Sequence, residues 1–182
     1  MPTRFREDKT TQAAATLLRM RGGAMSHLKL IKLLYLMDRE ALKRWGRPIT
    51  FDWYYSMPHG PVLSFTLDRI NEGADDDSYW SRFIGERKNH EVKLRDHVVC
   101  PNDQLSPAEE ELIGEIFQEF GHKTRWQLRD LTHLLPEWQD PKGSRAPIEY
   151  ADILRVEGFS PEEIREVEAD LEESSLADAL FG

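Results

Sequence analysis

One long amphipathic segment, HLKLIKLLYLMDREALKRW at residues 27–45, constrains the fold more than any other feature of the chain. Ser26 precedes the segment as a candidate N-cap, and Gly46 with Pro48 ends it. On a helix the polar arc would hold Lys29, Lys32, Arg39, Glu40, Lys43 and Arg44. The wider arc is apolar and includes Leu30, Ile31, Leu34, Ala41, Leu42 and Trp45. We therefore expect a helix at the centre of the core.

Asp38 projects from the middle of this apolar arc. A buried carboxylate must be hydrogen-bonded or paired, or it is protonated. One interpretation is a catalytic or recognition acid. The other, which we prefer, is an internal strut that accepts hydrogen bonds from a neighbouring loop.

The remaining elements follow from start and stop signals. A first helix is expected from Lys9 to Arg21, and residues 47–57 should form a short strand or an ordered loop. A third helix should begin at Gly60 and Pro61 and end near Gly73. A β-hairpin is expected around Lys88 and Asn89, with residues 97–100 in a strand. Capping boxes at 106–109, 124–127 and 160–163 predict three later helices.

These elements predict a mainly α (α+β) fold: a compact helical domain around a central apolar helix, with a small β-hairpin. We expect one domain over residues 1–155, followed by an acidic C-terminal helix and tail over 156–182. The last helix carries a narrow apolar stripe, and residues 173–182 beyond it should be frayed or disordered unless a partner orders them. Leu180 and Phe181 should pack back on the domain rather than form a docking peptide.

Composition excludes several classes of protein. No apolar run approaches the roughly 20 residues of a membrane span, and no signal peptide is evident, so we expect a cytoplasmic protein. Cys100 is the single cysteine, which excludes an internal disulfide and a multi-cysteine metal site. The net charge is −9, although residues 1–50 hold eleven Lys and Arg against four acids, and residues 160–182 hold eight acids against one Arg.

The sequence contains no recognisable catalytic motif. It lacks an HExxH segment, a GxSxG elbow, a GxGxxG turn and a phosphate-binding Gly-rich loop. A site built from His59, His133 and Asp38 would need distant residues to meet. The missing motifs leave an enzyme hypothesis without recognisable residues, apart from a hydrolase that would use His59 and Asp38, and we expect no metal and no cofactor.

An aromatic stretch beside the central helix is the better candidate for function. Trp, Tyr and Arg dominate protein–protein hot spots. The proposed partner-binding residues are Trp45, Arg47, Phe51, Trp53, Tyr54 and Tyr55. A second enriched patch contains Trp126, His133 and Trp138.

An alternative function is that of a DNA-binding regulator that uses the basic face of residues 29–47, although an acidic chain makes nucleic acid an unfavourable partner.

The segment SMPHGPVLSF raises the question of what His59 does. No motif partner is available to His59 for catalysis. Gly60 and Pro61 explain the stretch as a turn, and a ring nitrogen of His59 could donate to a buried acceptor. We therefore predict a contact between His59 and Asp38, direct or through one neighbour.

Three segments in this order and spacing also carry a family resemblance: KLLYLMDRE, HGPV and LTHLLPEW. From about Thr10 to Tyr150 the chain resembles the Panacea-domain family, the SocA-like antitoxins of bacteria and phages. The family's recurrent positions map onto Asp38, His59, Gly60, Pro61, His133 and Trp138, which we interpret as fold determinants.

The resemblance implies a mostly helical fold and a non-enzymatic antitoxin role in a toxin–antitoxin system. It implies a cognate protein toxin as the partner, neutralised by direct binding. It also implies that the domain could act as a proteolytic adaptor that delivers the toxin to a ClpXP-type protease. The resemblance does not identify the toxin or the oligomeric state.

Overall fold

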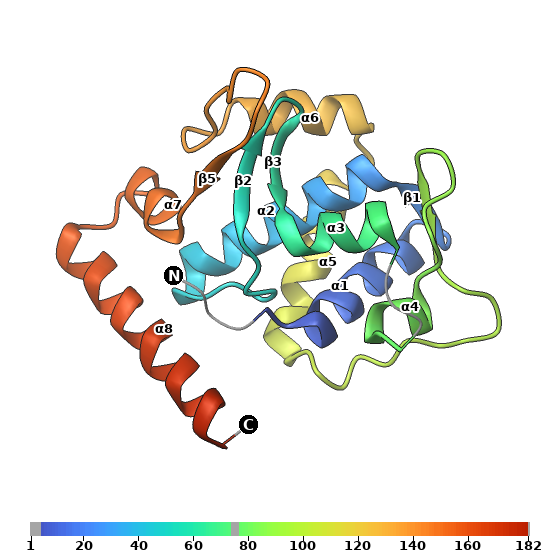
Figure 1. Cartoon of the computed structure of the whole chain (residues 1–182), viewed down its shortest axis with the longest axis horizontal. Helices are drawn as coiled ribbons and strands as arrows, with labels where there is room; N and C mark the ends of the chain where they lie inside the picture. The colour runs from blue at the N-terminus through green and yellow to red at the C-terminus, as the bar shows by residue number, and fades with distance from the viewer. Residues whose placement is uncertain (1–4, 74–76, 182) are drawn as a thin grey trace.

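A computed structural model describes residues 5–73 and 77–181 of the chain. Its centre is helix α2 (His27–Trp45), which has the predicted bounds and ends at Gly46 in the left-handed conformation. Helices α1 (Glu7–Met20), α5 (Pro107–Phe120), α6 (Arg125–His133) and α7 (Tyr150–Val156) all pack against α2 (Figure 1). The predicted mainly α fold with a central apolar helix is confirmed.

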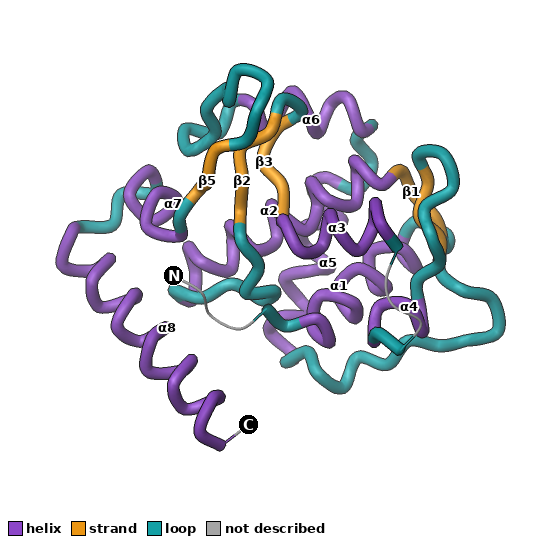
Figure 2. The backbone as a smooth tube through the Cα atoms, viewed as in Figure 1, coloured by secondary structure: helices purple, strands orange, loops and turns teal. Residues whose placement is uncertain are grey.

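Two small antiparallel sheets complete the domain (Figure 2). One has the order β3–β2–β5, built from Gly60–Leu63, Tyr54–Met57 and Ala146–Ile148. In this sheet Tyr54 lies opposite Leu63 on one side and Ile148 on the other. The other sheet pairs β1 (Ala24–Ser26) with β4 (Glu91–Lys93). Both sheets thereby join residues that are far apart in the sequence.

The segment that begins at Gly60 is a strand, where the sequence predicted the start of a helix. Gly60–Leu63 forms β3 against β2, and helix α3 (Ser64–Glu72) starts only afterwards. Helix α3 has no side-chain cap from its own N-cap residue. Instead the buried carboxylate of Asp52 accepts hydrogen bonds from the backbone N–H groups of Phe65 and Thr66, at 2.9 Å each. A distant residue therefore supplies the cap.

The predicted hairpin around Lys88 and Asn89 is present, but its first arm is shorter than expected. Bridges join Lys88 to Glu91 and Ile84 to Leu94, and Asn89 has a positive φ of 57°. The residues before the turn, however, include helix α4 (Tyr79–Phe83), which Ser78 caps with its side chain. Strand β4 pairs with β1 on one side, and Gly85 and Lys88 form hydrogen bonds with it on the other. Residues 97–100 are not a strand.

The C-terminal helix starts were predicted correctly. Ser106 and Thr124 form complete capping boxes with Glu109 and Gln127, and Ser160 with Glu163 makes the same reciprocal pair. Strand β5 and helix α7 were not anticipated. The last helix, α8 (Pro161–Phe181), continues through the segment that was expected to fray. Leu180 and Phe181 are 75% and 88% exposed, so the expected packing of the tail on the domain is wrong.

Candidate functional site

The three motif segments meet at the turn between β2 and β3. We call this arrangement the turn clasp: three carbonyl oxygens of the turn each accept one hydrogen bond from another element. Trp138 Nε1 donates to Met57 O at 3.0 Å, and His133 Nε2 lies 3.0 Å from Pro58 O. Lys32 Nζ, on α2, donates to Pro61 O at 2.7 Å.

The two aromatic members of the clasp support each other. The rings of His133 and Trp138 are stacked, with centroids 4.1 Å apart. Because Pro58 O can only accept, His133 must carry its proton on Nε2. Partial burial lowers the pKa of His133, which favours the neutral ring. The resemblance had grouped His133 and Trp138 with the HGPV turn, and the contacts show how these residues hold it.

Gly60 lies against the clasp in a conformation suited to glycine. Its φ is +106°, and a Cβ atom placed there would lie 2.8 Å from Thr132 Oγ1 and 2.9 Å from Lys32 Nζ. Both distances are shorter than carbon contacts allow. A side chain at this position would therefore push the turn away from α2 and α6.

Lys32 is buried, where the helical periodicity had placed it in an exposed polar arc. Its side chain has no solvent exposure, and its ammonium group donates to a carbonyl oxygen rather than to a carboxylate. Burial lowers the pKa of Lys32 to about 7, because the charged ammonium loses its hydration. Periodicity missed it because a buried lysine without a carboxylate partner is rare in proteins.

Asp38 accepts hydrogen bonds from the loop that follows α2, as expected of an internal strut. The backbone N–H groups of Ile49 and Thr50 donate to Oδ1, and the hydroxyls of Thr50 and Tyr54 donate to Oδ2. Burial raises the pKa of Asp38 to about 6, while these four donors act in the opposite direction.

The predicted contact between His59 and Asp38 is wrong. His59 is exposed at the tip of the turn, with its ring 6.4 Å from that of Trp126 on α6. The donors to Asp38 come from the 49–54 loop instead, because that loop folds directly back over α2. His59 therefore lies on the surface, and the buried side of the turn is held by Lys32.

Glu137 is an important residue that sequence reasoning missed. It is buried, and it accepts hydrogen bonds from Tyr35 Oη at 2.9 Å and from Arg39 Nε at 2.6 Å. Arg39 also contacts Glu157 on the far side, at 2.5 Å. The sequence offered one signal for this cluster, which is the spacing of Lys32, Tyr35 and Arg39. Residues three or four apart share a helix face, so these three polar side chains point to the same side of α2. This face anchors both the turn and the segment after α6.

The aromatic stretch divides into a buried part and a surface part. Tyr54 is buried against Tyr35 and bonded to Asp38, so Tyr54 cannot contact a partner. The rings of Trp45, Phe51, Trp53 and Tyr55 are half-buried, and Arg47 is exposed. Trp45, Gly46 and Arg47 line a recess of about 530 Å³ with residues of α8. We call Trp45, Arg47 and the exposed end of α8 (Leu176, Leu180 and Phe181) the α8 surface.

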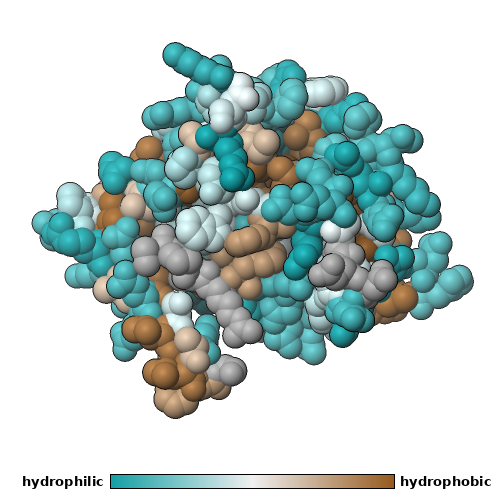
Figure 3. Space-filling view, viewed as in Figure 1, coloured by the Kyte–Doolittle hydropathy of each residue, from teal (hydrophilic) through white to brown (hydrophobic). Residues whose placement is uncertain are grey.

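Exposed apolar side chains gather at the C-terminal end of α8 (Figure 3). Single exposed apolar residues are normal on a protein surface, whereas a group of them marks an interaction site. A second exposed ring, Trp126 on α6, lies 4.9 Å from the guanidinium groups of both Arg125 and Arg129. The structure therefore offers two candidate partner-binding surfaces, one near each predicted aromatic patch.

The basic face predicted for DNA binding is largely occupied. Lys29 lines a pocket and Lys32 has no exposed surface, so neither adds to an outer basic face of the helix. Arg39 and Lys43 pair with Glu157, and Arg44 pairs with Glu40 and Glu115. A nucleic-acid backbone needs an extended row of unpaired cations, and the outer face of this helix does not offer one.

Neither a metal centre nor a membrane span is evident in residues 5–73 and 77–181. No group of three or more His, Cys, Asp and Glu side chains there could hold a metal ion. Across the same residues no helix is long and apolar enough to cross a bilayer. The fold and the clasp thus define a small, mainly α domain whose motif residues hold its own turn in place.

The chain belongs to a known family. The family model for the antitoxin SocA-like, Panacea domain matches residues 30–139, which run from α2 through the clasp residue Trp138. The predicted family is therefore confirmed, and membership supports an antitoxin role. No curated protein and no solved structure matches the chain.

Proposed function

We propose that this protein is the antitoxin of a toxin–antitoxin system and neutralises a cognate protein toxin by direct binding, without enzymatic activity. The observation that supports the proposal most strongly is the family match over residues 30–139. On this proposal residues 1–155 form the antitoxin domain, residues 156–182 are a C-terminal appendage, and the protein acts in the cytoplasm.

The α8 surface is the part that we propose contacts the toxin. Leu176, Leu180 and Phe181 are exposed at the free end of α8, and Trp45 and Arg47 lie beside its middle turns. Burying a leucine or phenylalanine side chain contributes about 1.5–3 kcal/mol. Such residues are unfavourable on a free surface and favourable in an interface, together with Trp and Arg.

Co-expression with the product of the adjacent gene tests the antitoxin role. We expect that product to be toxic alone, and harmless when it forms a stoichiometric complex with this protein. If the neighbour is harmless alone, or toxic but unable to bind, the proposal is wrong. Repeating the rescue in cells that lack the ClpXP-type protease tests the adaptor role, because sequestration would persist without the protease whereas delivery for degradation would not.

Substitutions test the α8 surface. The double variant Leu180→Asp, Phe181→Asp should weaken toxin binding by about a hundredfold, since two buried apolar contacts are lost. Leu134→Asp is the matched control, because Leu134 is 84% exposed on a different face, at the end of α6. Equal binding by the double variant and the wild-type protein would place the toxin elsewhere, with the Trp126 patch as the next candidate.

A further inference from the structure

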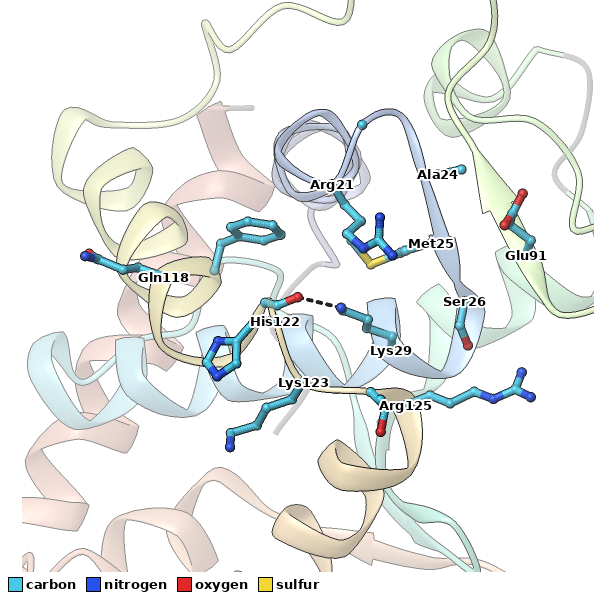
Figure 4. Close-up of a pocket in the computed structure, with 14 residues that line it drawn as sticks. Arg21, Ala24, Met25, Ser26, Lys29, Glu91, Gln118, His122, Lys123 and Arg125 are labelled. Carbon is cyan, nitrogen blue, oxygen red and sulfur yellow. Dashed lines mark hydrogen bonds between the residues drawn. The ribbon is translucent and has the colours of Figure 1, made fainter.

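A pocket of about 890 Å³ opens between the starts of α2 and α6 and the ends of α1 and α5 (Figure 4). It is separate from the clasp and from the α8 surface. Its charged and hydroxyl-bearing lining includes Arg21, Ser26, Lys29, Glu91, Lys123 and Arg125. Small-molecule sites have volumes of roughly 300–1,000 Å³, so the pocket can hold a whole metabolite.

The charge of the pocket is opposite to that of the chain. The chain has 33 acidic against 24 basic residues, yet four cationic side chains and one carboxylate line this pocket. Within the described residues, no ion pair forms at Arg21, Lys29, Lys123 or Arg125, whereas Arg39, Lys43 and Arg44 all pair with glutamates. An anion bound here would therefore find cations that no protein carboxylate neutralises.

Two polar groups of the pocket have bonding capacity to spare. Lys29 is 7% exposed, and its ammonium group donates one hydrogen bond, to Gly121 O, of the three it can make. Ser26 precedes α2 but makes no capping bond, and its buried Oγ has no hydrogen-bond partner among the described residues. Buried polar groups in proteins are normally satisfied, so the unpartnered Ser26 Oγ indicates a missing partner.

The four cations reach the pocket from different parts of the chain: the residue after α1, the first turn of α2, the link between α5 and α6, and the start of α6. In the view of Figure 4 the side chain of Arg21 lies above that of Lys29, whereas Lys123 and Arg125 extend to either side. Burial lowers the pKa of Lys29, and the nearby charge of Arg21 lowers it further. The first turns of α2 and α6, which add partial positive charge, begin at this pocket.

We propose that this pocket binds the phosphate group of a small-molecule ligand. The guanidinium of Arg21 and the ammonium of Lys29 would donate to phosphate oxygens, and Ser26 Oγ would complete the site. Lys123 and Arg125 would contact a second phosphate or the remainder of the ligand. A concave pocket with a local basic charge suits a compact phosphate compound better than a nucleic acid, which needs an extended basic face. The inference is independent of the antitoxin role.

Titration calorimetry of the full chain with sodium pyrophosphate, at constant ionic strength, tests this site. We expect saturable binding, weakened about tenfold by Arg21→Glu and severalfold by Ser26→Ala. Arg165→Glu is the matched control: it makes the same change of charge on α8, outside this pocket, and should leave binding unchanged. Circular dichroism of each variant shows that the fold is retained.

Parallel titrations with inorganic phosphate and with a nucleoside triphosphate identify the source of the phosphate group. Tighter binding of the nucleotide than of pyrophosphate would support an organic ligand, and equal binding would support free phosphates. The proposal is overturned if pyrophosphate does not bind at millimolar concentrations, if Arg21→Glu and Arg165→Glu have equal effects, or if only a polyanion such as an acidic peptide or DNA binds.

Discussion

At the scale of the residue, Gly60 is the position where the clasp tolerates least change. Its positive φ disfavours any side chain, and its surroundings leave no space for one. The atoms that a Cβ would meet belong to Lys32 and Thr132, which are buried and bonded to Pro61 O and Leu128 O. They cannot move without breaking those bonds.

We predict that Gly60→Ala destabilises the protein by about 3 kcal/mol, from backbone strain and from overlap together. Gly143→Ala is the control, because Gly143 has a similar φ of +90° but no atom within 4 Å of the place that a Cβ would occupy. This control should cost about 1 kcal/mol, the conformational part alone. Urea unfolding measures both values, and equal losses would show that the overlap at Gly60 is unimportant.

Lys32 makes stability depend on pH. Its folded pKa of about 7 lies below the ordinary value of 10.5, so between these values the unfolded chain binds more protons than the folded one. Stability therefore rises with pH across this window, and the destabilisation from the buried charge is complete below pH 7.

Between pH 7 and pH 9 we expect the wild-type protein to gain about 2 kcal/mol relative to Lys32→Met, which cannot titrate. Thermal unfolding of both proteins over this range measures the difference. Comparing the two removes the contribution of other groups, such as Cys100, whose pKa burial raises to about 11. Parallel pH profiles would contradict the interpretation of Lys32 as a buried, deprotonating amine.

At the scale of the element, local sequence determined the helix starts but not the strands. The boxes at Ser106, Thr124 and Ser160 work within one turn, so a few neighbouring residues are enough to predict them. The sequence predicted a helix where strand β3 lies because of Pro61. Proline is common both at the first position of a helix and at the start of a strand, so Pro61 does not distinguish the two. The pairing of residues 60–63 with Tyr54–Met57 is what makes this segment a strand rather than a helix.

Helix α3 also shows that local sequence is not enough to predict how an element begins. Its cap is Asp52, twelve residues before its first residue, so no local rule could have named it. The partners of Lys32 and Glu137 are likewise set by how α2 meets the β2–β3 turn and the segment after α6.

At the scale of the whole molecule, the domain and α8 differ in how much surface they bury. Ile164 and Leu171 are the buried residues of α8, and neither lies beyond the midpoint of the helix. The second half projects from the domain (Figure 1).

We predict that truncation after Glu173 changes the Tm by no more than about 2 °C, because almost no apolar surface is uncovered. The same truncation should abolish or strongly weaken toxin binding if the α8 surface is the contact. Differential scanning calorimetry measures the first effect and pull-down of the toxin the second. A large fall in Tm would show that the end of α8 stabilises the domain instead.

The sequence by itself determined the central helix, the buried strut at Asp38, the capping boxes and the family, because each depends on periodicity, short spacing or a recognisable order of motifs. Tertiary structure alone decided which side chains meet: Lys32 beneath Pro61, His133 and Trp138 on the turn, and Arg21 with Lys29 in a shared pocket. Those contacts depend on how elements far apart in the chain pack against one another. A sequence pattern does not contain the distances in space between such elements.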